Sequence, residues 1–310
     1  MWTTLAGALM GWSLGANDAA NIFGPMVGSG AIRFWRAAVL SSLFILLGAV
    51  LIGARGFATY EAIGTQTLLS AFLTMLAAGL TVTVMTLLGL PVSSTQAVVG
   101  AIIGSGLVFG GVTFAPLLKI FLSWILTPLG GLVASYVPYW LLSRFPDAVT
   151  TRLITRSRVL RIAMIVVMCY SAFSLGANNV ANVTGVYVGA GLFAPVTGAL
   201  FGAATIALGI LTFSQRVIRT VGTRIVELDP VGALVVVLSE AVTLNLFAVI
   251  GVPVSASQAV VGAVLGIGLV KGVQTVDRRV LRRVLFGWLG TPTLAALVSA
   301  TFSYVAMWLD

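Results

Sequence analysis

The sequence predicts an all-α polytopic membrane protein built from two related halves. Of its 310 residues, 59% are apolar and only 8% are charged, a balance outside the range of soluble globular domains. The apolar residues gather in about ten runs, each near the length that a membrane helix needs. Two polar, Gly-rich stretches each occur twice, in the same order, once in each half of the chain.

The ten predicted segments form two sets of five with similar spacing. They cover residues 2–30, 34–54, 66–88, 94–112 and 114–142, and then 159–190, 193–214, 231–250, 256–270 and 283–308. The polar connector 143–158 separates a first membrane repeat, 1–142, from a second, 159–310. Segments 94–112 and 256–270 are short, so each can be re-entrant instead of spanning.

The positive charges predict how the segments are oriented. If all ten cross, the connectors alternate between two sides, and the 17 Lys and Arg residues divide fifteen to two, with Arg55 and Lys119 as the minority. The side rich in positive charge is cytoplasmic, which places both termini outside. Because five is odd, the second half is inserted upside down relative to the first. Inverted repeats with broken helices at the midplane are typical of secondary transporters.

Several other classes of protein find no support. The net charge of +9 lies in short connectors, where membrane topology explains it, so no nucleic-acid partner is indicated. The chain has no His and no phosphate-binding G-x-x-x-x-G-K-[ST] loop, so we expect neither an enzyme nor a resident cofactor. Cys169 is the single cysteine and is interpreted as a small core residue. The N-terminus lacks a basic region and is interpreted as a first membrane segment instead of a signal peptide.

The first repeated stretch is SLGANDAANIFG at 13–24, which returns as SLGANNVANVTG at 174–185 with 8 of 12 positions identical. A carboxylate in an apolar segment is costly, so Asp18 is a functional-site hypothesis by default. Carboxyl and amide oxygens, together with carbonyls released by a broken helix, suit a small cation or a proton. The predicted cation-binding residues are Asn17, Asp18, Asn21, Asn178, Asn179 and Asn182.

The second repeated stretch is PVSSTQAVVGAIIG at 91–104 and PVSASQAVVGAVLG at 253–266, identical at 10 of 14 positions. Pro followed by Ser and Thr predicts a helix N-terminus at membrane depth, whose free N–H groups and hydroxyls bind oxyanions. We expect the two starts to converge near the midplane. The alternative is an N-cap with a small-residue helix contact, which Gly100, Gly104 and Gly106 suit. Two copies in inverted halves favour the ligand site.

Two further features stand out. Glu240 is acidic within an apolar segment and is either a second proton- or cation-binding group, a possible coupling acid, or an acid that faces a water-filled cavity. Trp124, Thr127 and Pro128 recur as Trp288, Thr291 and Pro292, a pattern interpreted as an interfacial anchor with a helix kink. Anion donors beside cation ligands imply symport, while a channel stays an alternative because pores also use paired half-helices.

These stretches resemble the signature of the inorganic phosphate transporter (PiT) family, whose relatives include compact sulfate permeases. They stand here as GANDAANI, GANNVANV, GLPVSSTQ and GVPVSASQ, with QRVIRTVGTRIVELDP at 215–230. The resemblance implies cation-coupled import of a tetrahedral oxyanion. It assigns the anion to Ser93, Ser94, Thr95, Ser255 and Ser257, and the cation to Asn17, Asp18, Asn21, Asn178 and Asn182. We also expect Gln96 and Gln258 to bind the anion, and Asn17, Asp18 and Asn178 to bind Na⁺ if the coupling ion is sodium.

The sequence departs from the family pattern at its motifs. The second family Asp is Asn179, both motif histidines are Gln96 and Gln258, and a long central insertion is missing. Phosphate is therefore the leading substrate and sulfate the alternative, with Na⁺ or H⁺ as the coupling ion. We expect a multi-pass protein of the plasma membrane in contact with lipid, and a homodimer stays open.

Overall fold

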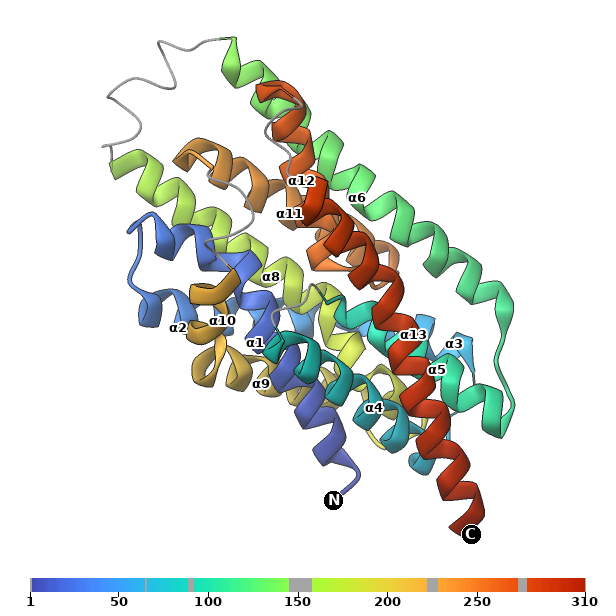
Figure 1. Ribbon diagram of the computed structural model, residues 1–310. Helices are drawn as coiled ribbons and strands as arrows, with labels where there is room; N and C mark the ends of the chain where they lie inside the picture. Colours follow the sequence, from blue (N-terminus) through green and yellow to red (C-terminus); the bar gives the residue numbers. More distant parts are fainter. Residues whose placement is uncertain are drawn as a thin grey trace.

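The computed structural model describes residues 2–64, 66–88, 92–144, 158–221, 228–272 and 278–309. These residues form a bundle of helices (Figure 1). Within the described ranges the only β-type pairing is a single bridge between Gly64 and Val112. The all-α prediction is therefore confirmed.

The helices follow the ten predicted segments in order. In the first half they are α1 (Thr4–Gly28), α2 (Phe34–Leu51), α4 (Leu68–Leu87), α5 (Ser94–Phe109) and α6 (Phe114–Ser143). In the second half they are α8 (Arg158–Gly189), α9 (Pro195–Thr212), α11 (Pro230–Ile250), α12 (Ala256–Lys271) and α13 (Arg278–Leu309). Three short helices were not predicted: η1 (Gly53–Gly56), α3 (Phe57–Ile63) and α10 (Ser214–Val221).

Seven of the described helices are long and apolar enough to cross a membrane: α2, α4, α6, α8, α9, α11 and the Leu285–Leu309 part of α13. Helices α5 and α12 have 16 residues each and therefore reach about 24 Å, less than the hydrocarbon thickness of about 30 Å. Helix α1 has 25 residues but carries the first polar stretch. A count of ten full spans therefore stays a prediction.

The prediction that the helix breaks at the GAND stretches is wrong. Both α1 and α8 run through these stretches as continuous helices. No proline interrupts the backbone ladder of either stretch, and Pro25 of α1 comes only after the first one. Any ligand here is therefore met by side chains instead of released carbonyls. The backbone is extended instead just before α5 and α12, at their N-caps Ser93 and Ser255.

The two halves pack into one another through glycines. Helix α1 lies against α9, and its counterpart α8 lies against α2. A Cβ at Gly15 of α1 would stand 2.0 Å from the Ile206 carbonyl oxygen, and one at Gly176 of α8 would stand 2.1 Å from that of Ile45. Gly15 and Gly176 are equivalent positions of the first repeated stretch. Only glycine allows the backbones to approach this closely.

The Ser-rich helices are packed in the same reciprocal way. Helix α5 lies against α13, where a Cβ at Gly100 would stand 2.2 Å from the Pro292 carbonyl oxygen. Helix α12 lies against α6, where Gly262 approaches the Pro128 carbonyl oxygen equally closely. The small-residue contact considered as an alternative for these stretches is thus present, and the repeated Trp-Thr-Pro pattern supplies its partner surface. This contact leaves the helix N-termini available for another role.

The chain ends lie at one end of the bundle. Figure 1 shows the first turn of α1 and the last turn of α13 at the lower end, and the last turn of α6 and the first turn of α8 at the opposite end. Residues 145–157, most of the predicted connector 143–158, lie outside the described part of the chain. The ends of α6 and α8 nevertheless agree with a connector on the side opposite the termini.

We predict that Gly176→Ala destabilises the protein by about 1–3 kcal/mol, because the added methyl group overlaps the Ile45 backbone and forces α8 away from α2. Thermal unfolding of the purified protein in detergent measures the effect. Gly290→Ala is the matched control, since a Cβ there meets nothing within 4 Å. Equal melting of both variants would contradict the close-packing argument.

Candidate functional site

The two Ser-rich helix starts are built alike. Ser93 is the N-cap of α5, and its Oγ accepts a hydrogen bond from the Gln96 N–H at 3.3 Å. Ser255 is the N-cap of α12, and its Oγ accepts from the Gln258 N–H, also at 3.3 Å. A side-chain cap satisfies one of the free N–H groups at a helix start and leaves others for a ligand. Both predicted caps are present.

The two starts face each other and exchange hydrogen bonds. The Thr95 hydroxyl donates to the Val254 carbonyl oxygen at 3.0 Å, and the Ser257 hydroxyl donates to the Val92 carbonyl oxygen at 3.1 Å. Thr95 and Ser257 are equivalent positions of the second repeated stretch, as are Val92 and Val254. The predicted convergence of the two helix N-termini is therefore seen among the described residues; Pro91 lies outside them.

The first repeated stretches also meet. The Asn179 amide donates to the Asp18 carboxylate at 3.1 Å, so equivalent positions of α1 and α8 touch directly. The Ser94 hydroxyl is a second hydrogen-bonding neighbour of Asp18. Asp18 is buried, with 3% of its surface exposed, and thus lies where α1, α8 and the start of α5 come together.

Asparagines of α8 hold both helix starts in place. The Asn178 amide donates to the Val254 carbonyl oxygen at 2.7 Å, and its carbonyl oxygen accepts from the Val254 N–H at 3.1 Å. The Asn178 amide also donates to the side-chain oxygen Oδ1 of Asn179. The Asn182 amide donates to the Thr95 hydroxyl at 3.0 Å. One face of α8 therefore fixes the residues before α12 and the first turn of α5.

Three more polar residues belong to this region: Asn17 and Asn21, which were predicted, and Tyr60, which was not. The Asn17 amide donates to the Thr86 hydroxyl of α4 at 3.0 Å and is not joined by hydrogen bonds to Asp18 or Asn178, the other members of the predicted sodium set. Asn21 is half-buried one turn further along α1. Tyr60 of α3 was not predicted, yet its hydroxyl donates to the side-chain oxygen Oδ1 of Asn182 at 2.5 Å. No repeat or spacing in the sequence marks Tyr60.

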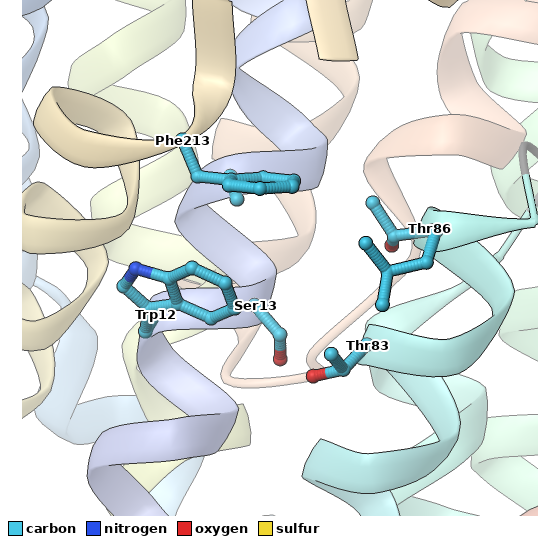
Figure 2. A pocket seen from close by; sticks show the side chains of 7 residues that line it. Trp12, Ser13, Thr83, Thr86 and Phe213 are labelled. Atoms are coloured by element: carbon cyan, nitrogen blue, oxygen red, sulfur yellow. The ribbon is translucent and has the colours of Figure 1, made fainter. Parts of the chain in front are cut away.

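A small hollow opens beside Asn17. Figure 2 shows its lining, with the Phe213 ring above Trp12 and the Ser13 hydroxyl turned toward that of Thr83. The Trp12 and Phe213 ring centroids are 5.2 Å apart, and the indole N–H donates to Thr212 at 2.9 Å. The lining also includes Thr86, the partner of Asn17. The hollow therefore lies between α1, α4 and the junction of α9 and α10, next to the polar stretch of α1.

Three of the predicted site residues carry a buried side-chain oxygen that accepts no hydrogen bond. Among the described residues, Oε1 of Gln96, Gln258 and Glu240 is buried without a hydrogen-bond partner. Gln96 and Gln258 are equivalent positions in the first turns of α5 and α12. A buried oxygen without a partner is unusual in a folded protein and calls for a cation, a proton or water. The sequence named these three residues.

The buried charged side chains of the described residues are acidic. Asp18 and Glu240 are buried, whereas every Lys and Arg whose side chain the structure describes is exposed. The ion pair found among the described residues, Lys271 with Asp229 at 2.5 Å, joins the end of α12 to the start of α11. Since buried charges need compensation, an anion in this site would have to arrive with cations or protons.

The donor set also indicates which ion fits. In the described ranges no three His, Cys, Asp or Glu side chains gather as a metal-binding group. The oxygens present come from amides, hydroxyls and one carboxylate, ligands that suit a hard cation and not a soft transition metal. The residues around Asp18 thus offer the kind of oxygen ligands that a hard cation takes.

Comparison with known proteins agrees with this geometry. The chain matches the model of the "Phosphate transporter family" over residues 14–156 and again over residues 151–299. The chain belongs to this family. The family model therefore matches twice, and the two matched stretches meet inside the polar connector.

Individual relatives cover nearly the whole chain. A protein of Pyrococcus furiosus named "Putative phosphate permease" is 26% identical over 96% of this chain and 93% of its own length. One of Methanocaldococcus jannaschii with the same description is 28% identical over 92% of this chain and 90% of its own length. A solved structure described as "The sodium-dependent phosphate transporter" matches with a TM-score of 0.82 and 26% identity, over 99% of this chain and 98% of that one.

We predict that Asn178→Ala destabilises the fold by about 1–3 kcal/mol, because it leaves the buried N–H of Val254 without its acceptor and removes one of the two donors to the Val254 carbonyl oxygen. Chemical unfolding in detergent measures the loss. Asn245→Ala, at a half-buried amide of α11 outside this network, is the control and should cost less. A smaller effect at Asn178 than at Asn245 would show that the clamp on Val254 is dispensable.

Proposed function

We propose that this protein is a secondary active transporter that imports inorganic phosphate by symport with Na⁺ or H⁺. The single observation that carries the proposal is the meeting of two helix N-termini beside buried Asp18, with no buried Lys or Arg among the described side chains. Free N–H groups and hydroxyls attract an oxyanion, but the nearby carboxylate repels it. A cation bound between them removes the repulsion, so anion and cation enter together.

In the proposal the predicted anion-binding residues keep their role, whereas the predicted cation-binding residues divide between contact with the cation and support of the site. The anion is met by Ser93, Ser94, Thr95 and Gln96 of the first start and by Ser255, Ser257 and Gln258 of the second. The cation is met by Asp18 with Asn179 and Asn182, while Asn178 positions the second start through Val254. Asn17 and Asn21 extend this polar face of α1 toward the hollow beside Thr86.

The names of the relatives support phosphate as the substrate, and the sodium dependence of the structural neighbour supports sodium as the coupling ion. Sulfate is the second candidate, because it is also a tetrahedral oxyanion and both motif histidines are glutamines here. A channel is less well supported. The hydrogen bonds that join the two starts have to break before an ion passes, which suits a transport cycle better than an open pore.

We expect wild-type protein in liposomes to accumulate labelled phosphate only when a Na⁺ or H⁺ gradient points inward. Asp18→Asn should remove most of this cation-driven uptake, since it keeps the volume of the side chain but removes the charge that attracts the cation. Exposed Glu61→Gln is the matched control and should transport normally. Gradient-independent flux would refute symport, and sulfate uptake that excess phosphate leaves unaffected would refute the substrate.

We also propose that the protein lies in the plasma membrane with both termini outside and the connector between α6 and α8 in the cytoplasm. In a Cys169→Ala background, an impermeant thiol reagent added to intact cells should label Trp2→Cys near the N-terminus and spare Ser143→Cys at the end of α6. Both native side chains are exposed. The reverse pattern would invert the topology, and labelling of both would place the two helix ends on one side.

A further inference from the structure

The internal repeat shows that the second half carries its buried acid at a different place from the first. Asp18 of α1 is matched by Asn179 of α8, while Glu240 of α11 is matched by Ala78 of α4. The register of α4 and α11 is supported by Thr81 and Thr243, which are matched three residues further on. Among the described residues, each half thus contributes one buried acid, but from different helices.

Glu240 is poorly satisfied as a charged group. Its side chain is fully buried, Oε1 has no partner, and Oε2 accepts only a long hydrogen bond of 3.4 Å from the Ser171 hydroxyl of α8. The neighbouring hydroxyls of α11 do not help. Those of Ser239 and Thr243 each donate at 2.7 Å to a carbonyl oxygen of their own helix. A buried carboxylate with so few donors is costly, whereas a neutral carboxylic acid is not.

Among the described charged and titratable groups on the elements that pack against α11, Asp18 is the one whose charge acts on Glu240. Helix α11 packs against α8, α6, α12, α1 and η1. On η1, the Arg55 guanidinium donates to the Val249 carbonyl oxygen, nine residues or about 14 Å along α11. Tyr139 of α6 and Lys271 of α12 both contact Asp229, eleven residues away at the other end. Tyr170 of α8 is half-buried. Asp18 lies on α1, which packs against α11, and it touches Asn179 of α8, the helix whose Ser171 is bonded to Glu240, so a charge on Asp18 repels one on Glu240.

We propose that Glu240 is a proton-binding site whose occupancy is coupled to the charge at Asp18. A metal cation at Glu240 would need several oxygen ligands, and one weak hydroxyl partner with two hydroxyls committed to their own helix does not supply them. A proton needs a single carboxylate oxygen, and Oε1 is available for it. Glu240 therefore replaces, as a titrating group, the acid that Asn179 lacks.

The coupling follows from electrostatics and rests on the proposed cation site at Asp18. While Asp18 is charged and has no cation, ionisation of Glu240 would place two negative charges in one buried region, so Glu240 keeps its proton. When Na⁺ binds at Asp18, the repulsion falls and the carboxylic acid can dissociate to a carboxylate and a proton that leaves to solvent. Na⁺ binding at Asp18 thus favours proton release from Glu240, so the two sites oppose each other in binding their positive ions.

The test measures protons released when Na⁺ is added to the purified full-length protein in detergent, in weak buffer with a pH-indicator dye. Choline chloride at the same concentration corrects for ionic strength. We expect wild-type protein to release up to about one proton per chain near neutral pH. Glu240→Gln should release none, Asp18→Asn should release none, and the exposed control Glu61→Gln should match the wild type.

Two further measurements keep the outcomes distinct. Glu240→Asp retains an acid and should retain the release, which separates loss of the proton site from loss of the fold. Binding of radioactive Na⁺ should persist in Glu240→Gln, because its ligands lie at Asp18. Full proton release from Glu240→Gln would overturn the proposal and assign the proton to Asp18, and loss of Na⁺ binding in this variant would make Glu240 a cation ligand instead. None of these measurements uses phosphate, so a failed substrate assignment leaves them interpretable.

Discussion

The arrangement of this protein depends on hydrogen bonds to backbone N–H and C=O groups that are not helical but lie inside an apolar bundle. The residues before α12 are extended, and in such surroundings each unpaired N–H or C=O costs several kcal/mol. The Asn178 side chain pairs with both polar groups of Val254, and the Thr95 hydroxyl adds a second donor to the same carbonyl oxygen. These bonds set where the helix N-termini point and hence where a ligand can bind.

The bonds from Asn179 to Asp18 and from Asn182 to Thr95 in turn require that α8 reach the first half. Asn178 lies two residues after Gly176, whose missing side chain lets α8 touch the backbone of α2. The same device at Gly15 brings α1 against α9. The glycines and the asparagines of one stretch therefore have separate tasks: the glycines close the distance between helices, and the amides use that proximity to bind a neighbouring backbone or carboxylate.

The two halves match closely in packing but differ in where they carry a buried negative charge. The Asp18 carboxylate touches Asn179 at the pseudo-equivalent position, so a second negative charge is absent at the contact itself. Two carboxylates in direct contact and without water would repel strongly. The second acid, Glu240, lies instead on α11, which packs against α1, and within the described part of the chain it is hydrogen-bonded to Ser171 and not to Asp18. An asymmetric site within a nearly symmetric frame is the result.

The sequence alone determined the class of protein, the order of the long helices and the two repeated stretches, because composition, run length and repetition are local properties that need no partner. It also marked Asp18 and Glu240, since an acid in an apolar run is conspicuous wherever it points. The tertiary structure decided that the GAND helices are unbroken, that Asn17 faces Thr86, and that Tyr60 reaches Asn182. These facts depend on which helix lies opposite each side chain, and the spacing of residues along one helix does not contain that information.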